Sequence, residues 1–387
     1  MDVCAWNPPS SLFVPSLCYS ITGPETASEG LIDWPRSEVA SINRYEDAWE
    51  DLHDCVDEFC IFVNKGFDGQ GIAAVTTPEN YYRMARLSGS GSNGSGIDRY
   101  RLAESPGKGR GLFARRAIQR GEQVMSTRPA ILVHQRMANE LDLEDVYDLL
   151  DTAVESLPLK RKESYMEQVG HMGGHKTADI LFTNAYQLSL GKDDSFHYGS
   201  FPDASMINHD CRPNLAFYVD QNLTFTAHAA RNIEKGEELT VSYLDPFQLR
   251  NLRQERAKNT LGFSCTCSQC SLPKKEADAS DARLLSITDI EGQLSDFNSQ
   301  TSSPAMIEEL MLLYRQEHLE SKLSGAYTLA ALNYNLFGKK RMAQQYAELA
   351  VEAGTLENGH DSTDISVMRE LAGNPKGHWS WNKKGSS

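Results

Sequence analysis

The stretch INHDCRPN at residues 207–214 decides the fold, together with three shorter stretches that lie on either side of it in the chain. It supplies an amide, an imidazole and a thiol within a few residues. Downstream, GEELTVSY at 236–243 ends a strand-like run on a tyrosine, and FSCTCSQC at 263–270 contains three closely spaced cysteines. Upstream, GKGRGLFA at 107–114 is rich in glycine. Each stretch alone is ambiguous, so the inference rests on their shared order and spacing.

The composition is that of a globular protein. The 387 residues are 40% hydrophobic and 24% charged, enough for one large domain or for two to three modest ones. No apolar run is long enough to span a membrane. Residues 1–19 make a poor signal peptide, so secretion stays open only if the start codon is mis-assigned. The net charge of −15 argues against direct nucleic-acid binding. It suits a basic partner such as a lysine-rich tail, and equally suits plain solubility.

Three cysteines, Cys265, Cys267 and Cys270, predict a metal site because they are too closely spaced to be separate core positions. A tetrahedral zinc ion needs four ligands, and Cys211, in a polar loop, is the best candidate for the fourth. Two disulfides are the alternative, which ring strain between Cys265 and Cys267 disfavours. We expect the remaining cysteines to be small buried side chains: Cys4, Cys18, Cys55 and Cys60. Zinc-bound and unpaired thiols both favour a reducing compartment, the nucleus or the cytoplasm.

The pattern along the chain divides it into four regions. Residues 1–99 form an N-terminal segment, with a helix predicted over 44–59, a strand over 72–77 and a Gly/Ser-rich linker near 88–96. Residues 100–250 carry short strands around a helical insert at about 135–200. Residues 251–275 hold the thiol cluster. Residues 276–387 are helical by period and contain one tetratricopeptide-like helix pair, which we interpret as a cap over a groove.

Within 100–250 the expected strands are short. Residues 123–133 carry strand-like apolar positions broken by Pro129, and 215–219 with 223–229 form a hairpin candidate. A further strand is expected over 239–244. Residues 141–190 have helical periodicity. Strands interrupted by a helical insert predict a compact α+β fold.

Several motif residues have plainer interpretations. Asn208 and His209 could be a satisfied polar turn, and Tyr243 could be a strand aromatic packed in a core. The glycines near 107–111 allow close backbone approach to a ligand. They do not fit a dinucleotide fingerprint, because neither their spacing nor their context matches it.

Together, the four stretches resemble the successive signatures of SET-domain protein-lysine methyltransferases, over roughly residues 100–271. The helical insert and helical C-terminus resemble the branch that includes the SET-and-MYND enzymes, but the cysteine/histidine-rich MYND module is missing. The chain is more similar to MYND-less fungal SET proteins, in which a Thr-Thr-Pro element such as residues 76–78 precedes the domain.

This resemblance implies a knot-like β fold that binds S-adenosylmethionine, with structural zinc at Cys211, Cys265, Cys267 and Cys270. It implies a catalytic role for Tyr243 and an adenine-stacking role for Phe263. The residues that match cofactor-binding positions are Lys108, Gly109, Arg110, Asn184, Ser205, Asn208, His209, Tyr243 and Phe263. Phe201 and Tyr243 match positions of the lysine channel. Because the family often has tyrosine at the position of Phe201, the number of methyl groups added stays open.

The implied activity is methyl transfer to the ε-amine of lysine in a protein, histone or non-histone. We expect a monomer whose partner is a lysine-containing substrate, histone tails among the candidates, with no direct role for nucleic acid or membrane. The alternative is a catalytically silent SET-domain binding module or scaffold. The phenylalanine at position 201 and the aspartate at position 210 motivate this alternative.

Overall fold

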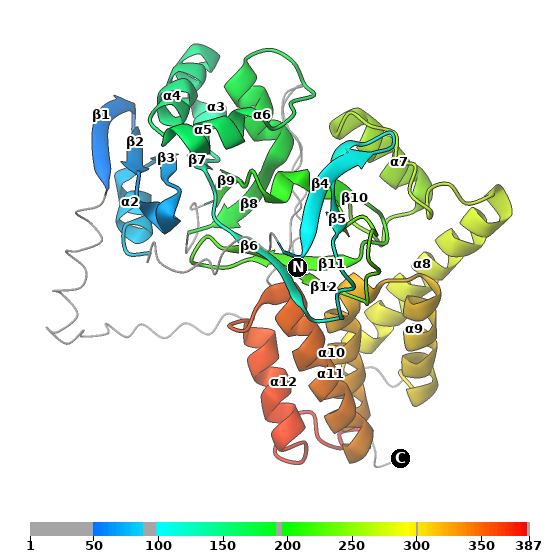
Figure 1. Ribbon diagram of the computed structural model, residues 1–387. Coiled ribbons are helices and arrows are strands. Elements are labelled where there is room, and N and C mark those ends of the chain that lie inside the picture. Colours follow the sequence, from blue (N-terminus) through cyan, green and yellow to red (C-terminus); the bar gives the residue numbers. More distant parts are fainter. Residues whose placement is uncertain (1–48, 88–97, 191–195, 299–300, 385–387) are drawn as a thin grey trace, which may run out of the picture.

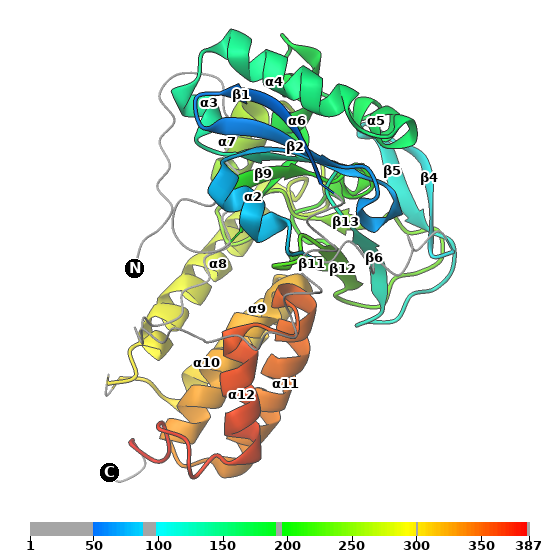
Figure 2. The ribbon, with the colours of Figure 1, turned by 90° about the vertical axis from the view of Figure 1, so that its left-hand side faces the viewer.

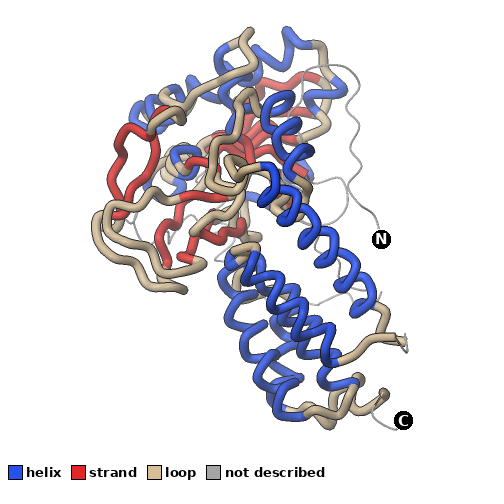
Figure 3. The backbone as a smooth tube through the Cα atoms, turned by 90° about the vertical axis from the view of Figure 1, so that its right-hand side faces the viewer, coloured by secondary structure: helices blue, strands red, loops and turns tan. Residues whose placement is uncertain are grey.

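A computed structural model describes residues 49–87, 98–190, 196–298 and 301–384 (Figure 1). The predicted Gly/Ser-rich linker, the N-terminal 19 residues and two cysteines, Cys4 and Cys18, lie outside this part. Within the described ranges, no helix has both the length and the apolar character needed to cross a membrane. The strands gather at one end of the molecule, and the long C-terminal helices extend from it (Figure 3).

The largest sheet joins the N-terminal segment to the region after residue 100. Its six strands have the order β1-β2-β3-β7-β9-β8. They are β1 (Glu50–Val56), β2 (Phe59–Asn64), β3 (Ile72–Thr76), β7 (Ile131–His134), β9 (Phe196–Ser200) and β8 (Ala185–Ser189). The strand predicted over 72–77 is confirmed as β3, which pairs in parallel with β7. Residues 50–76 and 131–200 therefore build one sheet.

The helix predicted for residues 44–59 is wrong in its described part. The chain forms β1, turns at Asp57, which has a φ of +51°, and returns as β2. All six residues of β2 are buried, and pairing with this apolar strand outweighs the helical period of the acidic stretch. The hairpin sets Cys55 opposite Cys60, and the two form a disulfide. The expectation of buried, unpaired cysteines is therefore wrong for this pair, because the two are bonded to each other and Cys55 is exposed. The pair no longer supports a reducing compartment.

Helices cover both faces of this sheet. The insert contains α3 (Met137–Glu140), α4 (Leu143–Glu155), α5 (Leu159–Met166) and α6 (Lys176–Asn184), and α4 lies across the strands (Figure 2). Because side chains alternate along a strand, Ile61 faces the insert core while Phe62 faces the other face. There Phe62 stacks on Tyr81 of α2 (Pro78–Met84), with ring centroids 4.1 Å apart. The helical prediction for 141–190 fails after Asn184, because residues 185–189 pair with β9 as β8.

Three smaller sheets make up the rest of the β region. A hairpin joins β4 (Tyr100–Ser105) to β5 (Gly109–Ala114), and a three-stranded sheet has the order β11-β12-β6. Its strands are β11 (Leu215–Val219), β12 (Phe225–Ala229) and β6 (Gln123–Thr127). This confirms the predicted hairpin and the break at Pro129. The strand expected over 239–244 is shorter: β13 (Thr240–Val241) pairs in parallel with β10 (Asn208–His209). That pairing brings the two central motifs together.

The C-terminal region is helical, as predicted. After α7 (Arg250–Thr260) come α8 (Lys274–Ser295), α9 (Pro304–Gln316), α10 (Leu323–Leu336), α11 (Lys340–Asn358) and α12 (Thr363–Gly373). Short 3-10 turns are η1 (Phe67–Gly69), η2 (Ala204–Met206) and η3 (Glu320–Lys322). The predicted pair is α10 with α11, in which Tyr334 stacks on Tyr346 and buried alanines allow close approach. These helices have their own apolar core, separate from the core of the β region.

Candidate functional site

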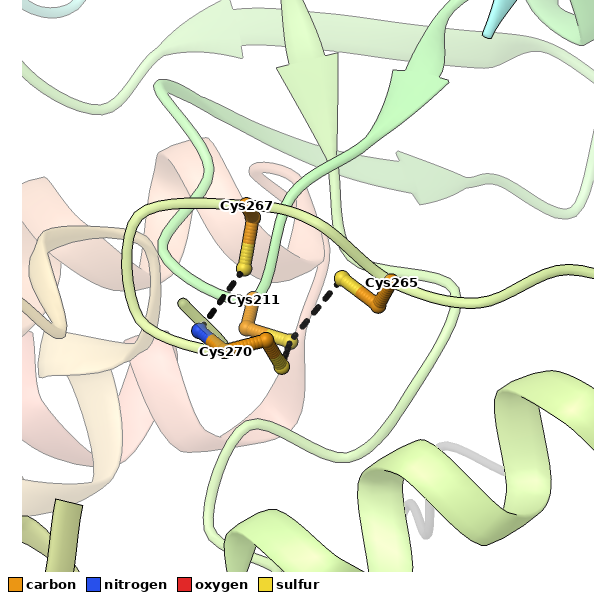
Figure 4. Close-up of side chains that lie close together, drawn as sticks. All are labelled: Cys211, Cys265, Cys267 and Cys270. Carbon is orange, nitrogen blue, oxygen red and sulfur yellow. Dashed lines mark hydrogen bonds between the residues drawn. The ribbon is translucent and has the colours of Figure 1, made fainter. Parts of the chain in front are cut away.

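Four buried cysteines converge where the loop after β10 meets the turn after α7 (Figure 4). Their sulfur atoms all lie within 4.8 Å of one another. The Cys211 sulfur is 4.0 Å from that of Cys265 and 3.6 Å from that of Cys270. A zinc ion about 2.3 Å from each sulfur would give tetrahedral edges of about 3.8 Å, so the spacing fits. The four thiols are free, so the two-disulfide alternative is wrong.

A buried arginine balances the charge of this cluster. Arg253 of α7 is only 1% exposed, and its guanidinium donates a hydrogen bond to the carbonyl of Gln248. Burial alone would lower the pKa of Arg253, but the nearby sulfurs of Cys211 and Cys270 outweigh it and raise that pKa. Four thiolates around a divalent cation carry a net charge of −2, and Arg253 offsets part of it. The donor set therefore fits a metal ion.

His209 connects the sulfur cluster to Tyr243. Its Nδ1 accepts a hydrogen bond from the backbone N–H of Tyr243 at 3.0 Å, so Nε2 carries the ring hydrogen. Nε2 lies 3.3 Å from the Cys211 sulfur and can donate to it. Burial lowers the pKa of His209 to about 4, and the charges of Lys108 and Arg253 act in the same direction. The imidazole is therefore neutral near pH 7.

Three aromatic rings form a cluster next to the thiols. The centroid of His209 is 5.4 Å from that of Tyr243 and 5.7 Å from that of Phe263. Tyr243 and Phe263 meet edge to face, 6.4 Å apart. The Tyr243 hydroxyl donates to the carbonyl of Ile207 at 2.5 Å. Burial, helped by the charge of Glu238, raises the pKa of Tyr243, so the phenol keeps its proton.

Three polar side chains next to His209, those of Asn208, Glu238 and Lys108, form a hydrogen-bonded group. The Asn208 amide donates to Glu238 at 2.8 Å and to the Arg110 carbonyl at 3.0 Å. Lys108 Nζ lies 3.3 Å from both Glu238 and the His209 carbonyl. Burial alone would raise the pKa of Glu238, but these partners hold it below its usual value. A Cβ on Gly111 would lie 2.5 Å from Glu238 and 2.6 Å from Asn208, so only glycine permits this approach.

The remaining predicted cofactor residues contact neighbouring loops. Arg110 is exposed, and its Nη2 donates to the Glu167 carbonyl at 2.9 Å. Gly109, with a φ of +74°, lies at the turn between β4 and β5. Asn184 donates to the carbonyl of Val169 at 3.0 Å. Ser205 lies on η2, which packs against β5, and donates to the Pro202 carbonyl at 2.8 Å.

Phe201, the predicted channel residue, is fully buried. Its ring meets that of Tyr186 at 5.6 Å, edge to face, and that of Phe225 at 5.9 Å. Tyr186 is half-buried in this aromatic group. Since Phe201 has no exposed surface here, its role in a substrate channel stays a prediction.

A buried ion pair ties the loop after β10, which carries Cys211 and is called the cysteine loop below, to the C-terminal helices. The Glu317 side chain is 0% exposed and accepts from Arg212 Nη2 at 2.7 Å, Arg283 Nε at 2.6 Å and Ser280 Oγ at 2.8 Å. Arg212 also donates to the carbonyl of Cys211 at 2.8 Å. Burial alone would raise the pKa of Glu317, but these donors hold it below its usual value. The position of Cys211 therefore depends on a carboxylate about a hundred residues away.

Sequence reasoning missed three residues that organise the site. Glu238 lies inside a motif that was recognised, and its place beside Asn208 could have been inferred from the paired motifs. The local sequence does not point to Arg253 or Glu317, because a charged residue in a helical region is expected to face solvent.

The comparisons with known proteins agree with this arrangement. Residues 109–244 match the family model described as the SET domain, so this region of the chain is similar to SET domains. The histone-lysine N-methyltransferase set5 of Schizosaccharomyces pombe is 25% identical over 72% of this chain and 85% of its own length. Human SMYD3, also named a histone-lysine N-methyltransferase, is 32% identical over 25% of the chain and 23% of its length. The chain is thus related to fission-yeast set5 and to the SMYD proteins.

The match to most of these relatives is partial. The N-lysine methyltransferase SMYD2-B of Xenopus laevis is 31% identical over 30% of this chain, which spans 28% of its length. A solved chain from Plasmodium falciparum, 15% identical, covers 38% of this chain and 93% of its own, with a TM-score of 0.22. That score is too low to support a structural argument.

Proposed function

We propose that this protein transfers methyl groups from S-adenosylmethionine to the ε-amine of lysine in a protein substrate. The observation that carries the proposal is Tyr243, a protonated phenol whose hydroxyl is fixed by the Ile207 carbonyl and whose ring lies beside His209 and Phe263. The relatives named as lysine methyltransferases support the same activity.

The cofactor would contact two kinds of surface in this site. Phe263 offers an aromatic face for the adenine, and the exposed guanidinium of Arg110 offers positive charge for the carboxylate of the amino-acid end. Between Phe263 and Arg110, the Asn208 amide and the Gly109 backbone would offer hydrogen-bonding groups to the cofactor. Asn184 and Ser205 would lie at the edges of this site. Lys108, whose ammonium faces Glu238, would act by fixing the loop. When bound, S-adenosylmethionine supplies a methyl group on positively charged sulfur, which is already electrophilic.

The chain's own residues would prepare the amine. Lysine has a pKa of about 10.4 and must lose a proton before its lone pair can react. A desolvated, aromatic environment favours the neutral amine. The Tyr243 hydroxyl gives its hydrogen to Ile207, so its oxygen remains free to accept a hydrogen bond from the amine and to orient its lone pair. Tyr243 is thus proposed as the catalytic residue, and Phe201 as a residue that shapes the channel.

Zinc is proposed at the four cysteines, in a structural role. All four positions would be filled by protein sulfur, which leaves no open position for a substrate. The ion would hold the turn that carries Phe263 against the loop that carries His209. Its contribution to activity would be indirect, through the position of these two side chains.

The proposed substrate is a basic protein, with histone tails as one candidate. The net charge of −15 favours association with lysine-rich segments through electrostatic steering. We propose that the protein acts as a monomer, in the nucleus or the cytoplasm.

Transfer of labelled methyl to histones and to a cell extract tests the function. We expect incorporation with the wild type and a loss of about 100-fold or more in Tyr243→Phe, with cofactor affinity by calorimetry largely retained. The control is Tyr82→Phe, an exposed tyrosine on α2, which should keep full activity. Cofactor binding without transfer to any protein would favour the silent binding module instead.

A further inference from the structure

A glycine-rich loop of the helical insert lies beside the candidate cofactor residues. This insert loop, residues 167–174, joins α5 to α6 and none of the motifs above includes it. Its backbone accepts hydrogen bonds from two predicted cofactor residues, since Arg110 donates to Glu167 and Asn184 donates to Val169. The loop therefore connects the glycine-rich hairpin to the end of α6.

The insert loop has a defined anchorage on α6. The Asp179 carboxylate accepts from the backbone N–H groups of Met172 at 2.9 Å and Gly173 at 3.1 Å. A Cβ on Gly170 would lie 2.3 Å from that carboxylate, so glycine is required for the close approach. With its backbone held in this way, the loop presents the side chain of His171 in a fixed position.

His171 joins the insert to the segment just before Phe263. Its Nε2 lies 3.2 Å from the carbonyl of Thr260, and because a carbonyl only accepts, Nε2 is the donor. Its Nδ1 and its backbone N–H both lie 3.2 Å from Thr183 Oγ1. The ring also packs over Gly262, where a Cβ would be 2.4 Å from it. The His171 side chain thus links Thr183, the residue before Asn184, to the turn that leads into Phe263.

We propose that His171 is a positioning residue that clasps the helical insert to the turn carrying Phe263, and so controls how long the cofactor stays bound. The proposal rests on the proposed function, because it takes Asn184 and Phe263 as opposite sides of one cofactor site. With the clasp closed, the two sides keep a fixed separation. Without it, Phe263 is held by α7, by the turn of Cys265, Cys267 and Cys270 and by the rings of His209 and Tyr243, but no longer by the helical insert.

Three substitutions separate the contacts of His171. His171→Gln keeps a donor close to the place of Nε2, His171→Asn keeps a polar group near Nδ1, and His171→Ala keeps neither. His171 is exposed, so all three variants should fold. For the full-length, zinc-loaded protein we expect S-adenosylmethionine to dissociate about tenfold faster from His171→Ala, and within about twofold of the wild-type rate from His171→Gln. His171→Asn should resemble the alanine variant. The control is His318→Ala, an exposed histidine among the C-terminal helices.

A second measurement does not depend on the cofactor. Hydrogen exchange in the cofactor-free protein reports on the Phe263 amide, which donates to the Ala257 carbonyl at 3.1 Å. We expect exchange in residues 257–263 to be several-fold faster in His171→Ala and unchanged in His318→Ala. Equal exchange in His171→Ala and the wild type would overturn the clasp, as would equal cofactor dissociation. If the wild type binds no cofactor, the proposed function fails, while the exchange result still decides whether the clasp exists.

Discussion

Glu317→Gln tests the junction between the cysteine loop and the C-terminal helices. In the wild type, the fully buried carboxylate lies between the guanidinium groups of Arg212 and Arg283 and also accepts from Ser280 and Gln269. Glutamine has the same size and keeps one acceptor oxygen. It removes the negative charge, however, and places an amide N–H₂ among groups that are already donors. The variant therefore leaves two guanidinium groups without their counter-charge.

The structure sets the size of the effect. Removing one partner of a buried ion pair costs about 3–5 kcal/mol. Arg283 has 31% of its side chain exposed and can recover hydration, whereas Arg212, at 5%, cannot. We therefore expect the lower end, a loss of about 3 kcal/mol in the free energy of unfolding.

Equilibrium urea unfolding of the full chain, followed by tryptophan fluorescence, measures this loss. The matched control is Glu352→Gln, which breaks an exposed pair between Arg120 and α11 and should cost less than about 0.5 kcal/mol. Equal losses in the two variants would refute the reasoning. Because the pKa of Glu317 is lowered by folding, its contribution is present above about pH 4.3 and is lost as the pH falls through the folded pKa. The difference in the free energy of unfolding between the wild type and Glu317→Gln should therefore become smaller below pH 4.

Other substitutions have equally defined outcomes. Burial raises the pKa of Glu357 from 4.5 to about 7, so its ionisation destabilises the fold as the pH rises through this range. Glu357→Gln should raise the free energy of unfolding by up to about 3 kcal/mol at pH 8 and hardly at all at pH 4, in the same urea assay. Cys265→Ala should abolish stoichiometric zinc in a metal assay and weaken S-adenosylmethionine binding by calorimetry; unchanged affinity without metal would contradict the structural role. Gly111→Ala should push Asn208 away from Glu238 and weaken cofactor binding while zinc content stays at one per chain; unaltered affinity would show that this contact is dispensable.

Sequence reasoning succeeded where the signal is local. The spacing of Cys265, Cys267 and Cys270 is sufficient to predict a metal site, and the turn chemistry around residues 220–222 is sufficient to predict the hairpin of β11 and β12. It failed where a partner distant in sequence decides the outcome. Residues 50–56 have a helical period, yet an apolar β2 makes them a strand. The role of Glu317 depends on Arg212, and that of His171 depends on Thr260. The local sequence around these residues predicts neither contact.

The acidic residues of β1 also affect contacts between copies of the chain. Among the described strands, β1 is an edge of the six-stranded sheet, and such an edge can template pairing with another chain. Glu50 and Asp54 are exposed along it, and a register shift between Asp51 and Cys55 interrupts its ladder. Glu50 also forms an ion pair with Lys65 at 2.9 Å, so the edge carries charges of both signs. These charged side chains and the broken ladder together disfavour edge-to-edge aggregation. Replacing these acids by threonine would preserve the strand while making the protein prone to self-association at high concentration.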